Sequence, residues 1–161
     1  MESRAKASSS QICDQEKITR LSSVHRFGIA ETVWRKALMS ATLDSVAGIK
    51  HAELCGDSSR RLHVAEISDK VTCHVHLCGC EAYEIVSGSG KLLSGPVSKT
   101  GDVYLPIRCD SLTVRVGDVF NVPEGFAHQL VRVENKPLII IFACSDNHLG
   151  SDRLVMPDMK V

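Results

Sequence analysis

Apolar residues near the start of the chain recur at the spacing of a helix. Between residues 27 and 43 they are Ile29, Val33, Trp34, Ala37, Leu38 and Ala41. A stripe that repeats every three or four residues lies on one helix face, so this stretch predicts an amphipathic helix. Glu31 in the first turn suits the positive end of the helix dipole. We expect the helix to pack on the rest of the protein or on a second subunit, with Trp34 as its anchor.

After Gly48 apolar and polar residues alternate over short segments, which is typical of strands. Turn residues separate these segments. The predicted strands cover residues 50–55, 62–67, 71–77, 82–86, 91–93, 112–116, 119–122, 127–133 and 137–144. The last of them contains a continuous apolar run, LIIIFA, typical of a strand buried on both faces. Strands this short and this closely spaced predict an all-β barrel or sandwich.

Residues 94–110 are the least regular internal stretch of the chain. We expect Gly95, Pro96, Gly101 and Pro106 to interrupt any long strand here. The stretch is therefore interpreted either as a surface hairpin or as a lid over a binding site.

Both ends of the chain differ from its strand-rich middle. Residues 1–24 begin polar and serine-rich, without periodicity, and predict a mobile arm. The tail mixes polar residues with Leu154, Val155 and Met156, and we expect it to pack back on the barrel or on a neighbour. The chain divides into an N-terminal arm with the amphipathic helix (residues 1–47), a β-barrel (48–145) and a C-terminal tail (146–161).

The composition excludes several classes of function. The 161 residues have the length of one domain, and the 19 basic and 19 acidic residues cancel, so no net charge attracts nucleic acid or an anionic membrane. No segment approaches the roughly 18 apolar residues of a membrane span, and residues 1–20 lack the apolar core of a secretory signal. Seven cysteines leave at least one thiol unpaired, which fits a reducing compartment. We expect a cytoplasmic protein that binds neither nucleic acid nor membrane.

Potential metal ligands gather in two segments. In HVHLCGCEAYEIVSGSG, His74 and His76 point to the same side of a strand, and Glu81 can return to them from the next strand after a short turn. In GDVFNVPEGFAHQLVR, a Pro-x-Gly turn leads into a strand that carries His128. Three neutral imidazoles and one carboxylate suit iron, manganese, nickel, copper or zinc, and suit calcium or magnesium poorly. We interpret the remaining His25, His51, His63 and His148 as core or surface residues.

With these residues the chain resembles the cupin superfamily. The first cupin motif, Gly-(x)5-His-x-His-(x)3–4-Glu-(x)6-Gly, is matched by His74, His76, Glu81 and Gly88. The second, Gly-(x)5-Pro-x-Gly-(x)2-His-(x)3-Asn, is matched by Gly117, Pro123, Gly125 and His128. Ser68 replaces the opening glycine of the first motif and Arg132 the closing asparagine of the second, and neither is a ligand position.

The resemblance covers roughly residues 48–145. It implies a single cupin-type β-barrel, or jelly roll, with an N-terminal helical extension. It also implies a metal in the barrel mouth, held by His74, His76, Glu81 and His128. The family is often dimeric, so we expect a homodimer in which the amphipathic helix and the apolar C-terminal residues serve as the contact.

Strand periodicity predicts which side chains surround the metal. Counting by twos from Glu81 places Tyr83 on the inward face, and counting from His128 places Arg132 there too. Tyr83 either donates a hydrogen bond and acts as a general acid or base, or only packs in the barrel. Arg132 either binds an anionic substrate group or pairs with an acidic residue such as Glu134.

The ligand set leaves a divalent metal with a net charge of about plus one, which favours an anionic oxygen ligand. We expect an enzyme that acts on a small anionic or oxygen-rich metabolite by isomerase, lyase or decarboxylase chemistry, through a metal-stabilised enolate. An iron(II)-dependent dioxygenase is the first alternative, because iron accepts the same ligands. A non-catalytic small-molecule-binding barrel is the second, although the first 47 residues hold only one credible helix and no helix-turn-helix output domain.

Overall fold

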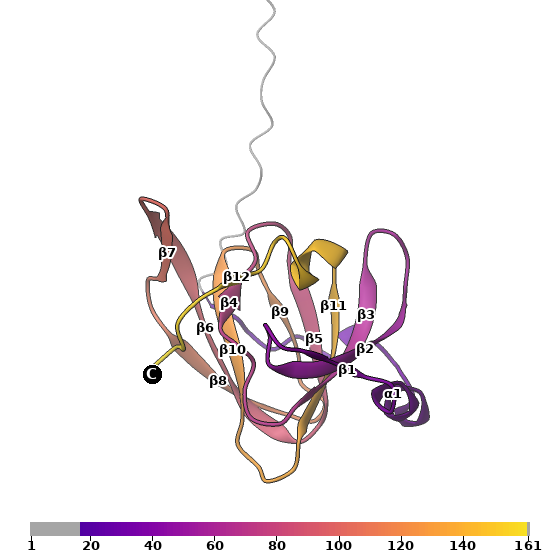
Figure 1. The fold of residues 1–161 in the computed structure, drawn as a ribbon. Coiled ribbons are helices and arrows are strands. Elements are labelled where there is room, and N and C mark those ends of the chain that lie inside the picture. The colour runs from indigo at the N-terminus through magenta and orange to yellow at the C-terminus, as the bar shows by residue number, and fades with distance from the viewer. Residues whose placement is uncertain (1–16, 161) are drawn as a thin grey trace, which may run out of the picture.

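This computed structural model describes residues 17–160, which fold as two curled antiparallel sheets around one core (Figure 1). The first sheet runs in the order β1 (Thr42–Asp44), β2 (Ile49–Gly56), β3 (Arg61–Ile67), β11 (Leu138–Cys144), β5 (Glu81–Ser87) and β9 (Val119–Val122). The second runs in the order β12 (Leu154–Val155), β4 (His74–Val75), β10 (Phe126–Arg132), β6 (Ser89–Thr100) and β7 (Val103–Pro106), with β8 (Asp110–Arg115) also paired to β6. The predicted all-β barrel with an N-terminal helix is confirmed.

The core between the sheets is built from alternate residues of the strands, as the period-two pattern requires. Its fully buried members include Ile67, Ile85, Leu92, Val114, Phe120, Leu138 and Ile140. Every residue of β11 is buried, because its other side lies under the helix α1. The prediction that the LIIIFA run is buried on both faces is confirmed.

The helix α1 (Glu31–Leu38) is shorter than the stretch 27–43 that its periodicity predicted. After Leu38 the chain turns and enters β1, where the carboxylate of Asp44 accepts the N–H groups of Val46 and Ala47. Gly48 then adopts a positive φ of 73°, and β2 returns antiparallel to β1. Hairpin pairing therefore overrides the helical spacing of the last residues of the stretch.

Trp34 is the anchor of α1, with 3% of its surface exposed. It packs on the outer face of the first sheet, against Val64, Ile139 and Ile141. Trp34 on the apolar face of the helix is thus covered by its own chain, whereas Val33 is 51% exposed.

Residues 17–24 of the predicted mobile arm are held against the barrel. Ile18 is buried in the core cluster, Arg20 forms an isolated bridge with Phe120, and Leu21 N–H donates to Val119 C=O. A short 3-10 turn, η1 (Ser23–His25), follows. The rest of the predicted arm, residues 1–16, lies outside the described residues.

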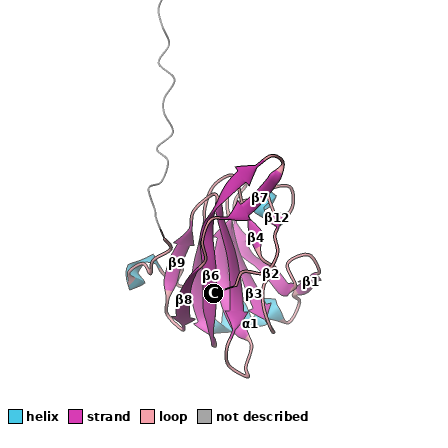
Figure 2. Cartoon of the chain, turned by 90° about the vertical axis from the view of Figure 1, so that its left-hand side faces the viewer, coloured by secondary structure: helices cyan, strands magenta, loops and turns pink. Residues whose placement is uncertain are grey.

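The expected interruption of residues 94–110 is wrong, because β6 continues through Gly95 and Pro96 to Thr100 and forms a hairpin with β7. Gly95 is required there, since a Cβ would lie 1.8 Å from the carbonyl oxygen of Arg108. Pro96 lacks an N–H donor, but its carbonyl still accepts the N–H of Ile107. The hairpin lies at the margin of the molecule (Figure 2).

The C-terminal tail packs on its own barrel. It forms a 3-10 turn, η2 (Asp146–Leu149), and then β12, which pairs with β4. Met156 and Met159 are buried against Cys73, Val75, Leu93 and Ala127. No helix among residues 17–160 is long and apolar enough to cross a membrane.

Candidate metal centre

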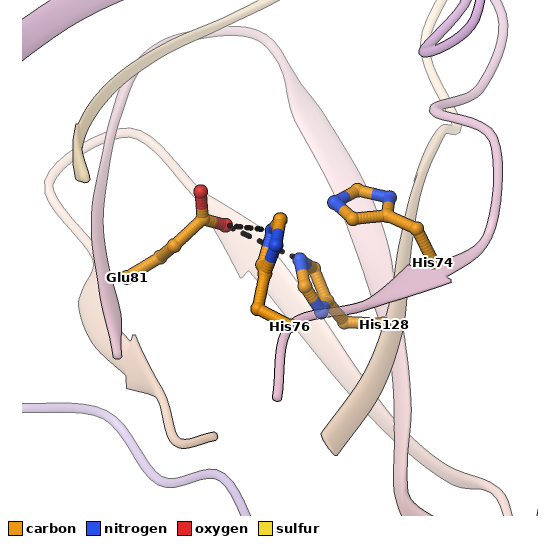
Figure 3. A group of neighbouring side chains, drawn as sticks. All are labelled: His74, His76, Glu81 and His128. Carbon is orange, nitrogen blue, oxygen red and sulfur yellow. Dashed lines mark ion pairs between the residues drawn. The ribbon is translucent and has the colours of Figure 1, made fainter. Parts of the chain in front are cut away.

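The four predicted ligands meet at one end of the barrel interior. His74 opens β4 and is paired in register with His128 on β10, while Glu81 opens β5 on the facing sheet. His76 follows β4 on the loop toward Glu81. All four side chains are buried, and one ligand atom from each lies within 4.8 Å of the others (Figure 3). The strand predicted over 71–77 is shorter in the structure, where β4 comprises only His74 and Val75.

Backbone carbonyls fix the orientation of the three imidazoles. Nδ1 of His74 lies 2.7 Å from the carbonyl of Thr72, and Nδ1 of His128 lies 3.0 Å from that of Phe126. Nδ1 of His76 donates to a carbonyl of the C-terminal tail. Each Nδ1 therefore carries the proton, and each Nε2 keeps the lone pair that a metal needs.

The distances between the ligand atoms suit a single metal ion shared by them. Nε2 of His76 lies 3.4 Å from Glu81 Oε2, and Nε2 of His128 lies 3.3 Å from the same oxygen. Neighbouring ligands about 2.1 Å from one metal lie roughly 3 Å apart when they subtend a right angle. His76 Nε2 is also buried without a hydrogen-bond partner among the described residues, which is costly unless something occupies its lone pair.

The electrostatics of the cluster leave the ligands in metal-binding form. Burial, aided by the neighbouring His128, lowers the pKa of His74 to about 3, so its ring is neutral at any physiological pH. Burial alone would raise the pKa of Glu81, but the close imidazoles of His128, His148 and His76 outweigh it and hold the pKa well below its ordinary value. Neutral imidazoles and one carboxylate fit a divalent transition metal.

Tyr83 lies inside the site, as the strand periodicity predicted. Its hydroxyl donates to Glu81 and lies 3.2 Å from His128 Nε2. Burial and the charge of Glu81 raise its pKa well above 10, so the phenol stays protonated. Its ring is stacked between Phe120 and Phe142 on the sheet face, at centroid distances of 5.3 and 6.0 Å.

Arg132 does not belong to the site. It lies at the far end of β10, paired with Gly90, and its Nη1 donates to the carbonyl of Asn135. The alternative pairing with Glu134 is not formed either, because that carboxylate accepts from Ser89 and lies near Lys136. Four residues along a strand span about 13 Å. Counting by twos from His128 therefore predicted the strand face of Arg132 but not its distance from the metal-site residues.

His148, which the sequence interpretation assigned to the core or surface, is part of the cluster. Its ring lies parallel to that of His76, with centroids 4.0 Å apart and 6° between the planes. Its Nε2 donates to the carbonyl of Cys78 at 2.6 Å, and its Nδ1 lies 3.4 Å from Glu81 Oε1. Burial would lower its pKa, but the contact with Glu81 raises it above the ordinary value. No motif spacing indicates this residue, because it reaches the site from η2.

The cluster forms the end of a cavity with about 470 Å³ of space, including the part that opens to solvent. Beyond the cluster, the only charged side chains that the described residues contribute are Asp44 and Arg153, which pair with each other. The walls are otherwise apolar and consist of Ala47, Ile49, Val71, Leu130, Ile140, Phe142 and Leu149. Residues 94–110 do not line it, so their hairpin is a surface feature and not a lid over this cavity.

Comparisons with known proteins agree with this fold. No family model matches the chain, and no curated protein matches it. A solved structure of an uncharacterised conserved protein with a double-stranded β-helix domain from Klebsiella pneumoniae matches with a TM-score of 0.53 and 13% identity, over 73% of this chain and 90% of that one. The oxalate decarboxylase of Bacillus subtilis, which has Mn(II) centres, matches with a TM-score of 0.53 and 16% identity, over 74% of this chain.

The chain has the double-stranded β-helix, or cupin, fold that its two motifs implied. It spans 31% of the oxalate decarboxylase chain, and at these identities the likeness concerns the fold alone. The buried cluster of three histidines and one glutamate in this barrel has the ligand types that could hold a divalent metal ion.

Proposed function

We propose that the protein is a metal-dependent enzyme that acts on a small anionic metabolite by isomerase, lyase or decarboxylase chemistry. The proposal is carried by the convergence of three imidazole Nε2 atoms and one carboxylate at the end of a cavity. Iron, manganese, zinc and nickel all accept this ligand set. Tyr83 joins this cluster with a hydroxyl proton to give.

The charges of the site indicate separate roles for the metal ion and for Tyr83. A divalent metal held by the four residues supplies Lewis-acid stabilisation of negative charge on a substrate oxygen, as in an enolate. Tyr83 holds its proton at neutral pH and can donate it within the cluster. The apolar walls lower the local dielectric and so strengthen both interactions.

The cavity walls narrow the substrate class. A sugar-like substrate would bring several hydroxyl groups against aliphatic and aromatic side chains, and each would lose its hydrogen bonds to water. A molecule with one oxygen-rich anionic head and an apolar body can place its head at the metal-site residues and its body against the apolar walls. We therefore expect metal-loaded protein to bind 2-oxohexanoate at least tenfold more tightly than gluconate, which has the same number of carbons.

The first test is elemental analysis of anaerobically purified protein, with His76→Ala and Glu81→Ala variants beside the wild type. We expect about one transition-metal ion per wild-type chain, and its loss in both variants with unchanged far-UV circular dichroism. The control is His63→Phe, which alters a buried histidine outside the cluster. Unchanged metal content in both ligand variants would overturn the proposal.

Oxygen uptake separates the remaining classes of function. Iron together with metabolite-dependent oxygen consumption would assign the protein to the dioxygenases instead. Zinc, nickel or manganese without uptake supports the isomerase or lyase proposal. Wild-type protein that binds no metal but retains ligand binding would make the cavity a non-catalytic binding site.

We also propose that the protein works in a reducing compartment, the cytosol, without nucleic-acid or membrane partners. Six cysteines among the described residues are free thiols, and two of them, Cys73 and Cys144, are buried with raised pKa values. The homodimer also stays a prediction. Trp34 and Met156 are covered by their own chain, while Val33 on the helix and Leu154 and Val155 in the tail are exposed and stay available for the predicted contact.

A further inference from the structure

The loop that joins two of the metal-site residues is held by Asp152 from outside the two cupin motifs, and by Glu124 of the second motif, which accepts the N–H of Gly79 at 2.9 Å. Between His76 and Glu81 the chain makes a turn over residues 77–80. The carboxylate of Asp152 accepts two N–H groups of this turn, from Leu77 at 2.8 Å and from Cys78 at 3.0 Å. The loop is therefore fixed by the C-terminal tail at its first two residues.

The same tail contacts both ends of the loop. The backbone carbonyl of Asp152 accepts the Nδ1–H of His76, which sets the tautomer and the rotation of that ring. His148 stacks on the other side of the same imidazole and directs its Nδ1 at Glu81 Oε1, 3.4 Å away. That oxygen is the one that does not face His76 and His128, whose contacts are with Oε2.

The His148 side chain is also fully buried. It is 1% exposed, and its Nδ1 is a buried atom without a hydrogen-bond partner in residues 17–160. Gly79, in the loop beside it, has a φ of 80°, and a Cβ there would lie 3.6 Å from His148 Nε2. The loop thus passes close against the His148 ring.

Separate contacts anchor the tail in this position. Val155 on β12 pairs with His74 on β4, so the tail is hydrogen-bonded to the strand that carries a ligand. Arg153 binds Asp44 with two nitrogen atoms. Farther along, Asp158 accepts from Gln129 and Lys70 and makes no hydrogen bond to residues 77–80.

We propose that residues 146–156 are a working part of the metal centre, in which His148 and Asp152 are positioning residues for His76 and Glu81. The inference rests on the proposed function in one respect, that the four cluster residues bind a divalent metal. Partners that orient metal ligands are worth about 10- to 100-fold in metal affinity when they are removed. We expect that loss from His148→Leu and from Asp152→Ala, and a smaller one from His148→Gln and Asp152→Asn, which keep part of the hydrogen bonding.

The experiment is a competition titration with a chelator that gives the Kd for Mn(II), combined with the EPR spectrum of the Mn(II)-loaded protein. Asp158→Asn is the matched control, because it weakens the same tail at a carboxylate that does not touch the loop. We expect a 10- to 100-fold rise in Kd and a changed EPR line shape for the leucine and alanine variants, and a Kd within threefold of wild type for the control. Circular dichroism and thermal melting of the metal-free proteins establish that each variant is folded, and the two conservative variants serve where one is not.

The outcomes separate this inference from the proposed function. Wild-type Kd and EPR spectrum in folded variants of both His148 and Asp152 would overturn the inference and leave the metal site standing. An equal loss in Asp158→Asn would also overturn it, because the effect would then be general loosening of the tail. Wild-type protein that fails to bind Mn(II), Fe(II) and Zn(II) would overturn both.

Discussion

Arg153 binds Asp44 with two guanidinium nitrogens, Nη1 at 2.6 Å from Oδ2 and Nη2 at 3.3 Å from Oδ1. The pair joins the C-terminal tail to β1, the first strand of the barrel. Both side chains are largely buried, with 9% and 13% of their surfaces exposed. A two-point contact of this kind fixes geometry as well as charge, so the tail is held at a defined position beside the cavity.

Asp44→Asn is expected to lower the free energy of unfolding by about 2 kcal/mol at pH 7, because a charged acceptor of several hydrogen bonds is lost. Arg153→Met should give a comparable loss. Urea denaturation followed by circular dichroism measures both. A change below roughly 0.5 kcal/mol in each variant would mean that the pair contributes only as an exposed ion pair does.

The Asp44 effect should also depend on pH. Burial acts to raise the pKa of Asp44, but the hydrogen bond from Arg153 and the N–H groups of Ala47 and Val46 outweigh it, so the pKa lies below its ordinary value. A lowered folded-state pKa contributes stability above the unfolded-state value of about 3.9, and this is lost as pH falls through the folded value. The difference between wild type and Asp44→Asn should therefore shrink as the pH falls below about 4. A difference that does not change with pH would contradict this account.

Tyr83→Phe should separate proton transfer from metal binding. The variant keeps the stacked ring between Phe120 and Phe142 and removes only the hydroxyl that donates to Glu81. We expect Mn(II) stoichiometry to stay near that of wild type, and the turnover of an identified substrate to fall by about 10²- to 10⁴-fold. Unchanged turnover would restrict Tyr83 to packing.

Arg132→Ala tests the corrected position of that residue. Its guanidinium donates to Asn135 near the end of β10 and does not line the cavity. We expect Mn(II) affinity and 2-oxohexanoate binding within twofold of wild type, measured by calorimetry. A loss of ligand binding of tenfold or more would return Arg132 to the site.

The four cluster residues could be predicted because the cupin motifs record a local relationship. His74 lies on β4, His76 on the loop that follows and Glu81 at the start of β5, so a short stretch of chain brings these three together, and the second motif adds His128 from β10. Alternation also predicted the strands of the barrel, since one face of each is buried. The error at Arg132 arose because periodicity gives the face of a residue but not its depth along the barrel.

Other features of the site depend on contacts that leave no local pattern. His148 reaches Glu81 from a short 3-10 turn across a large sequence separation, and no motif spacing links the two residues. The end of α1 was predicted too late for a similar reason, because the pairing of Thr42 with His51 decides it. Long-range pairing of this kind has to be seen in the structure, since neither partner's neighbours indicate it.

His63 offers the sharpest test of how the barrel interior tolerates a polar group away from the cluster. Its ring is 5% exposed and stacks on Phe142 at 5.1 Å, yet neither nitrogen has a hydrogen-bond partner among the described residues. A buried polar group without a partner costs about 1–3 kcal/mol, whereas an apolar ring of similar shape does not. His63→Phe should therefore raise the free energy of unfolding by about 1 kcal/mol at pH 7.5, measured by urea denaturation.

The gain from His63→Phe should grow as the solution becomes more acidic. Burial first, and the neighbouring His51 second, lower the pKa of His63 below its ordinary value. The unfolded chain then binds a proton near pH 6.5 that the folded protein does not, so wild-type stability falls as pH drops below 6.5, and the phenylalanine variant lacks this loss. Stability curves that stay parallel between pH 7.5 and 5 would mean that His63 takes up its proton as readily in the folded protein as in the unfolded chain. Water or a polar partner would then have to form hydrogen bonds with the His63 nitrogens. In that case the phenylalanine variant would not be more stable than wild type.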